Sequence, residues 1–283
     1  MKTVPLPGGN IWAGSRTYTE DQFPAVFSAF TNMIDNTADD LEANFYLVWV
    51  ITPDGVKLAI PAVWHENVHI GGAAPSFAEW NTIPAIDDST RIRNVVEWGK
   101  ETLESVSYGQ RQVFYMITVK SDLAVHQYSV EKFFELAAAA VTRIEGFQGN
   151  IVTQGINVPQ MEQMQKNGGN ALGLDPAEGA RYIIQIAIQW SEEKDDGAVY
   201  RLASDVLSST KDESIRRGAE SDYVYMNYAS MFQDVISSYG SANKARLLEV
   251  SRKYDPQQVF QKLQPGYFKL ERAPFPSTDF FSH

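Results

Sequence analysis

The sequence contains no cysteine in its 283 residues. Disulfide bonds, thiolate catalysis and cysteine-bound zinc are therefore excluded. Basic residues are also few, with 24 Lys and Arg against 35 Asp and Glu, which gives a formal net charge of −11. A chain of this charge repels phosphate backbones and anionic membranes on average, so neither nucleic acid nor a membrane is an expected partner.

Long apolar runs and phosphate-binding glycine motifs are missing as well. No segment is long and apolar enough to predict a transmembrane helix, and residues 1–5 do not resemble a signal peptide, so we expect a cytoplasmic protein. The glycine pairs Gly71-Gly72 and Gly168-Gly169 lack the spacing of a loop that cradles a pyrophosphate before a helix. We therefore expect no bound cofactor, and no tight binding of FAD by this chain alone.

Hydrophobic periodicity predicts helices that alternate with strands and hairpins. Thr52-Pro53-Asp54-Gly55 is a turn signal between two strands, and Ser129 stands where a helix N-cap is expected. The predicted strands are residues 45–51, 56–63, 112–119, 150–158 and 181–190, and the predicted helices are residues 19–34, 91–103, 129–144, 200–217 and 242–253. This pattern predicts an α+β fold, an antiparallel sheet covered on one face by helices.

Two of the predicted strands alternate in a way that suggests a binding surface. In residues 181–190, Tyr182, Ile184, Ile186, Ile188 and Trp190 point one way, under the helices. Gln185 and Gln189 point the other way. On the strand of residues 112–119, the side chains expected on the same face as these glutamines are Gln112, Phe114, Met116 and Thr118. Apolar side chains with a few amides are typical of a ligand pocket, although a solvated sheet face or ordinary core packing remains the alternative.

Three stretches of the sequence are distinctive when they are taken together. The first is Ile11-Trp12-Ala13-Gly14-Ser15 and the second is Gly168-Gly169-Asn170-Ala171-Leu172-Gly173-Leu174. The third begins at Tyr225-Met226-Asn227-Tyr228 and continues through Tyr239-Gly240 and Arg246-Leu247 to Tyr254-Asp255-Pro256-x-x-Val259-Phe260. In this order they resemble the substrate-binding and C-terminal part of fungal berberine-bridge-enzyme-like FAD-linked oxidases.

The resemblance implies a substrate-binding domain over residues 1–218 and a C-terminal berberine-bridge-like segment over residues 219–283 packed on it. It also implies that the flavin domain of the family precedes this part, and we expect that domain to be absent here. Tyr225 matches a tyrosine that lies beside flavin and substrate in the family, and a phenol can exchange a hydrogen bond with a reacting oxygen. A structural turn whose earlier role has lapsed is the alternative.

The resemblance and the strand parity together define the candidate site. We expect Tyr225, Gln185 and Gln189 to be catalytic, and Gln112, Phe114, Met116, Asn170, Asn227 and Tyr228 to bind substrate. No metal is expected, because His65 and His69 stand four residues apart in a segment that is not predicted to be helical. His126 is expected at the surface or in a loop, not as a base.

Three functions are compatible with this site. The first is a cofactor-independent enzyme of fungal secondary metabolism, such as a cyclase or pericyclase acting on a hydrophobic polyketide- or terpenoid-like substrate. The second is a fragment or subunit of an FAD-dependent oxidoreductase whose flavin domain lies on another chain, and the third is a non-catalytic binding protein. A homodimer formed through the sheet face that carries Phe114 and Met116 fits all three.

Overall fold

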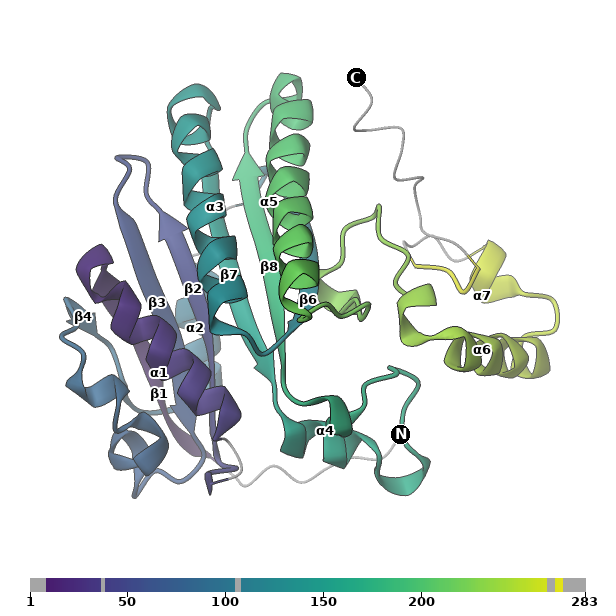
Figure 1. Cartoon of the computed structure of the whole chain (residues 1–283), viewed down its shortest axis with the longest axis horizontal. Coiled ribbons are helices and arrows are strands. Elements are labelled where there is room, and N and C mark those ends of the chain that lie inside the picture. Colours follow the sequence, from purple (N-terminus) through teal and green to yellow (C-terminus); the bar gives the residue numbers. More distant parts are fainter. Residues whose placement is uncertain (1–8, 37–38, 105–107, 264–267, 272–283) are drawn as a thin grey trace.

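The computed structural model describes residues 9–36, 39–104, 108–263 and 268–271. Within them eight strands form one antiparallel sheet in the order β4-β1-β3-β2-β7-β8-β6, with β5 also paired to β1 (Figure 1). The strands are β1 (Asn10–Thr19), β2 (Ala43–Ile51), β3 (Lys57–His65), β4 (Asp87–Asp88), β5 (Arg91–Asn94), β6 (Arg111–Lys120), β7 (Gln148–Ile156) and β8 (Arg181–Trp190). Residues 1–8 and 272–283, the two ends of the predicted domains, lie outside the described residues.

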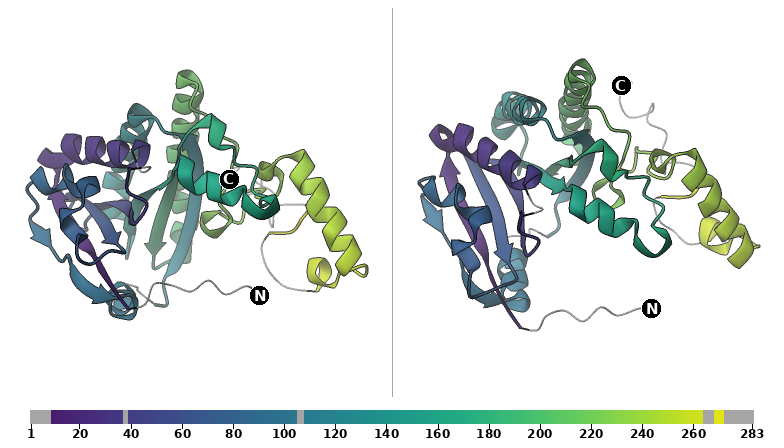
Figure 2. Two further views of the ribbon diagram at one scale, coloured as in Figure 1. Left: turned by 90° about the horizontal axis from the view of Figure 1, so that it is seen from below. Right: turned by 60° about the horizontal axis from the view of Figure 1, so that its bottom comes forward.

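Three long helices cover one face of the sheet. They are α1 (Phe23–Asp35), α3 (Leu123–Arg143) and α5 (Asp196–Arg217), and they lie side by side on that face in both views of Figure 2. On the other side of the sheet α2 (Val95–Glu104) lies near β1 and β5, and α4 (Val158–Met164) follows the end of β7. The helices α6 (Ser241–Tyr254) and α7 (Val259–Lys262) lie beyond β6, at the far end from β4 (Figure 1). The predicted α+β architecture is confirmed.

The main hydrophobic core lies between the sheet and the three long helices. The odd–even alternation of β8 places Tyr182, Ile184, Ile186, Ile188 and Trp190 in this core, as the sequence predicts. No helix in the described part of the chain is both long and apolar enough to span a bilayer.

A second, smaller core lies on the opposite face of the sheet. Met116 and Ile183 from the strands contact Met161 of α4 and the C-terminal residues Tyr223 and Tyr239 there. The helix α5 ends at Arg217, and Gly218 follows with a left-handed φ of 68°, which turns the chain toward this face. The predicted boundary between two domains at residue 218 stays a prediction. The segment after this residue packs against the same sheet as the residues before it.

Four of the five predicted helices begin four to six residues away from their predicted starts, and two of these errors concern capping. The helix predicted from residue 129 begins at Leu123, because Asp122 accepts hydrogen bonds from the backbone N–H groups of Ala124 and Val125. Ser129 instead lies buried inside α3 and donates to the carbonyl of His126. The helix predicted from residue 19 begins four residues later, because β1 extends to Thr19.

Candidate functional site on the open sheet face

Three neighbouring strands form a polar and aromatic surface on the face that the long helices leave uncovered. Four rows of directly paired residues cross β7, β8 and β6: Gln148–Gln189–Gln112, Asn150–Ala187–Phe114, Val152–Gln185–Met116 and Gln154–Ile183–Thr118. We call these four rows the open face. Because every second side chain of a strand points to the same side, all four rows share one face.

The register brings the predicted strand residues onto one surface but separates them along it. Gln185 and Gln189 lie four residues apart on β8, which is about 13 Å along a strand. Gln185 is buried, with 4% of its surface exposed. Phe114 is 45% exposed, and it lies in the uncovered part of the surface with Gln112. The two predicted glutamines therefore belong to different zones of the open face.

The segment that carries the Tyr-x-Asn-Tyr motif lies over the buried end of the open face. The Tyr228 hydroxyl donates to Gln154 Oε1 at 3.1 Å, and the Tyr228 ring meets Phe114 edge-on at 6.5 Å between ring centroids. Gln154 and Phe114 belong to the rows on either side of Gln185. Tyr228 therefore spans the row of Gln185 and contributes to its burial.

The same segment orients the Tyr225 phenol. Its ring packs edge-on against Tyr228 at 4.9 Å, and its hydroxyl oxygen accepts a hydrogen bond from Asn227 Nδ2 at 2.8 Å. No described residue accepts a hydrogen bond from the Tyr225 hydroxyl in return. The phenol is thus held by its oxygen, and its proton is free to be donated to a bound molecule.

Backbone contacts at the edge of β6 fix the position of this segment. The Gln233 amide bonds both to the N–H of Met116, at 3.3 Å, and to its carbonyl, at 2.8 Å, as a neighbouring strand would. Further along the edge, the N–H of Lys120 donates to the carbonyl of Ala219 at 2.8 Å. Because these bonds continue the sheet, the motif is attached to the strands that carry the open face.

Burial raises the pKa of two phenols in this region, Tyr228 and Tyr239. Burial raises the pKa of Tyr228, and the nearby Tyr225 and Tyr46 hydroxyls raise it further. The pKa of Tyr239 is raised for the same first reason, with Tyr225 again contributing. Neutral phenols and amides can donate and accept hydrogen bonds, so the site suits a neutral organic molecule with oxygen substituents.

The remaining predicted residues divide between the site and local structure. Met116 is 1% exposed and belongs to the second core, so its side chain packs within the chain and not on the exposed part of the face. Asn170 lies in the loop after α4, where its side chain accepts a hydrogen bond from the N–H of Leu172. Asn227 is exposed, and its side-chain amide donates a hydrogen bond to the Tyr225 hydroxyl.

The histidines differ from the sequence expectation in one case. His126, expected at the surface or in a loop, lies fully buried in α3, and its Nε2 faces the Trp49 indole N–H at 3.3 Å and the Thr153 hydroxyl at 2.8 Å. His65 is buried too, and it contacts Asp40 and the N–H of Asn67. The described residues contain no group of three His, Asp or Glu side chains that could hold a metal.

Sequence reasoning missed three residues in the site. Gln154 holds Tyr228, and Gln148 extends the row of glutamines onto β7. The signal was available, because Asn150, Val152 and Gln154 share one parity on the predicted strand. Tyr46 of β2 helps to raise the pKa of Tyr228. No sequence pattern predicted that Tyr46 lies near Tyr228, because only the pairing of β2 with β7 brings the two together.

FAD, which the family resemblance implies, does not fit the described residues as a whole. None of the four rows of the open face contains Lys or Arg, and a dinucleotide needs backbone or cationic donors for its diphosphate. Gly168 and Gly169 have positive φ angles of 91° and 71°, but the next long element in the chain is the strand β8 and not a helix. The phenols and amides fit an organic molecule on the sheet.

The antiparallel sheet with helices on one face is similar in fold to part of the berberine-bridge-type oxidases. Berberine bridge enzyme from Eschscholzia californica superposes with a TM-score of 0.61 at 11% identity, covering 94% of this chain and 56% of that one. The 6-hydroxy-D-nicotine oxidase from Arthrobacter nicotinovorans gives 0.57 at 16% identity, covering 89% and 53%. At these identities the likeness concerns the fold.

Sequence comparisons place the chain more narrowly. Residues 224–265, which include the Tyr-x-Asn-Tyr motif, match the family described as "Berberine and berberine like". The chain is 29% identical over 270 residues to the FAD-dependent monooxygenase sdcF of Emericella nidulans, covering 94% of this chain and 55% of that protein. It is 26% identical to the FAD-dependent monooxygenase drtC of Aspergillus calidoustus, covering 95% and 51%.

The chain is therefore related to the berberine-bridge-like FAD-linked oxidases, the family that its motifs resemble. It spans about half the length of the curated relatives that it matches.

Proposed function

We propose that the open face binds the hydrophobic organic substrate of a monooxygenase-type oxidoreductase of fungal secondary metabolism. One observation carries the proposal: the Tyr225 phenol is fixed by Asn227 and Tyr228 with its proton unused, and Tyr228 in turn is bonded to Gln154 of the open face. The relatives named as FAD-dependent monooxygenases support the reaction class.

The residues of the site define what the substrate should be. Tyr225 donates a hydrogen bond to a carbonyl or hydroxyl oxygen, and the Gln185 amide offers both a donor and an acceptor. The rings of Phe114 and Tyr228 provide an apolar, aromatic wall. A flat, oxygenated polyketide-like molecule satisfies these groups best, with a terpenoid-like molecule as the next candidate.

The redox cofactor is proposed to come from outside the described residues. A flavin domain on a partner chain, or elsewhere in the same polypeptide, would cover the exposed half of the open face. A homodimer is the other proposed occupant, and it would bury the exposed ring of Phe114.

A cofactor-independent cyclase or pericyclase remains the second candidate. Such a reaction needs a folded conformer of the substrate and one hydrogen bond to a polarised carbonyl, which Tyr225 or Gln185 could supply. The two candidates differ in one respect, because a cyclase converts its substrate without any flavin. A non-catalytic binding protein would use the same face without converting the ligand.

Replacing Tyr225 with Phe should weaken the binding of 1,8-dihydroxyanthraquinone about three- to tenfold, the effect of losing one neutral hydrogen bond. The probe is flat, apolar and oxygenated, and its binding is measured by quenching of the intrinsic tryptophan fluorescence. Tyr254→Phe is the matched control, since Tyr254 is 75% exposed on α6 and should bind the probe like the unmodified protein. Equal affinity of both variants, or no binding to either, would refute the assignment of Tyr225.

A further inference from the structure

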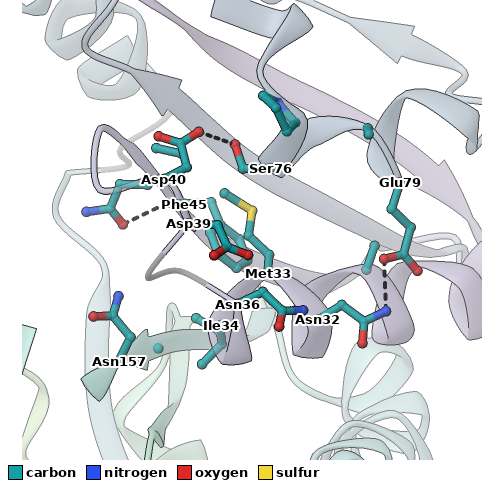
Figure 3. A pocket seen from close by; sticks show the side chains of 16 residues that line it. Asn32, Met33, Ile34, Asn36, Asp39, Asp40, Phe45, Ser76, Glu79 and Asn157 are labelled. Atoms are coloured by element: carbon teal, nitrogen blue, oxygen red, sulfur yellow. Dashed lines mark hydrogen bonds between the residues drawn. The ribbon is translucent and has the colours of Figure 1, made fainter. Parts of the chain in front are cut away.

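A separate cavity of about 310 Å³ opens at the end of the sheet where α1 ends and β2 begins. Figure 3 shows its side chains, which come from α1, from the chain leading into β2, from the turns around residues 75–79 and from the end of β7. None of the rows of the open face lines it. Its chemistry is therefore independent of the function proposed above.

Three carboxylates line the cavity, of which Asp40 is paired with His65 and Glu79 accepts a hydrogen bond from Asn32. Asp39, Asp40 and Glu79 line it, and no Lys or Arg does. Asp40 accepts a hydrogen bond of 2.6 Å from the Ser76 hydroxyl, and the ring of His65 lies behind it at 3.3 Å. Burial alone would raise the pKa of Asp40, but the bond from Ser76 and the charge and hydrogen bond of His65 outweigh it and lower the pKa, so this carboxylate is ionised at neutral pH.

An amide on the opposite side of the cavity presents a donor. Asn157 is 6% exposed, and its oxygen accepts a hydrogen bond from the N–H of Gln160, which caps α4. Its Nδ2 has no partner among the described residues, and in Figure 3 the amide nitrogen is turned toward the loop that carries Asp39 and Asp40. An N–H₂ group that faces a cavity can donate to an acceptor on a molecule that occupies it.

The floor of the cavity is apolar. Met33 and Ile34 of α1 and Phe45 of β2 provide it. An occupant therefore needs a cationic group for the carboxylates, an oxygen acceptor for Asn157 and a carbon skeleton for the floor. We propose that this cavity binds a protonated amine that carries neighbouring hydroxyl groups, of the size and kind of an amino sugar.

Three probes of similar size separate the parts of this inference. D-Glucosamine has the ammonium and the hydroxyls, D-glucose has only the hydroxyls, and cyclohexylamine has only the ammonium. At pH 6 the amines are protonated. By calorimetric titration of the full chain, glucosamine should bind at least tenfold more tightly than either of the other two. Equal binding of glucose would remove the role of the carboxylates, and equal binding of cyclohexylamine would remove the role of Asn157.

Two variants locate the binding and a third controls for net charge. Asp40→Asn and Asp39→Asn should each weaken glucosamine binding about tenfold. Asp40 contacts Ser76 and His65, so Asp40→Asn could unfold the protein. Asp39 is exposed, and Asp39→Asn should fold normally, so this second variant still tests the inference in that case. Asp212→Asn removes the same charge from the exposed side of α5 and should leave the affinity unchanged. Equal loss in all three variants, or no measurable glucosamine binding, would overturn the inference.

Discussion

Replacing Phe30 with Ala should lower the free energy of unfolding by about 3–5 kcal/mol, the range for deleting a buried aromatic ring. The Phe30 side chain is completely buried between α1 and the sheet. Its ring lies 5.0 Å from Phe45, 5.4 Å from Tyr182 and 4.9 Å from His126 between centroids, so that three elements lose a contact at once. Urea denaturation at 25 °C measures the effect.

Phe114→Ala is the matched control on the opposite face. The ring of Phe114 is 45% exposed and contacts Tyr228 at its edge, so its removal should cost less than about 1 kcal/mol. If the two variants lost similar stability, the helix-covered face would not be the main core, and the layer order described above would be wrong.

Lowering the pH from 6.5 to 4 should destabilise the protein by about 3 kcal/mol through His126 alone, at 1.36 kcal/mol per unit of pKa difference. Burial lowers the pKa of His126 to about 3, against an ordinary value of 6.5. Between these two values the unfolded chain binds a proton that the folded chain does not. The free energy of unfolding therefore falls as the pH falls through this window, and the contribution is complete above it.

The hydrogen bonds of His126 explain why the ring stays neutral. The Trp49 indole can only donate, so the Nε2 that faces it is an acceptor and the ring proton lies on Nδ1. Nδ1 is buried and has no hydrogen-bond partner among the described residues. A second proton on Nε2 would point at the Trp49 N–H, which adds to the cost of burying the charge.

Comparison with His126→Gln isolates this contribution, because both proteins keep all carboxylates and His65. The free energy of unfolding, measured in urea at several pH values from 7 to 4, should decline more steeply for the unmodified protein than for the variant. Parallel curves would show that His126 is not the group responsible, whatever the absolute stability of the variant.

The sheet was predictable because its signal lies in local alternation. The strand at residues 181–190 matches β8 at both ends, and its parity correctly separates Ile186 from Gln185. The Pro-Asp-Gly turn before residue 56 was equally visible. In contrast, the helix predicted from residue 91 divides into β5 and α2, because Arg91–Asn94 pairs with β1, a partner about eighty residues away that no local pattern reveals.

The candidate site was only partly predictable for the same reason. Parity placed Gln112, Phe114 and Gln185 on one face, but the cover over Gln185 depends on how residues 219–240 return to the edge of β6. The bond between Tyr228 and Gln154 joins residues 74 positions apart. His126 was misplaced because a single histidine in a helical segment carries no sign of the Trp49 and Thr153 partners that make its burial possible.

The most direct test of the central claim is where an oxygenated aromatic ligand binds. In protein labelled with ¹³C at the methionine methyl groups, NMR titration with 1,8-dihydroxyanthraquinone should shift the signals of Met116 and Met226, which border the Tyr225 segment. The signal of Met33, which lines the separate cavity, should stay in place. A shift of Met33 without any change at Met116 and Met226 would contradict the assignment of the open face as the substrate site.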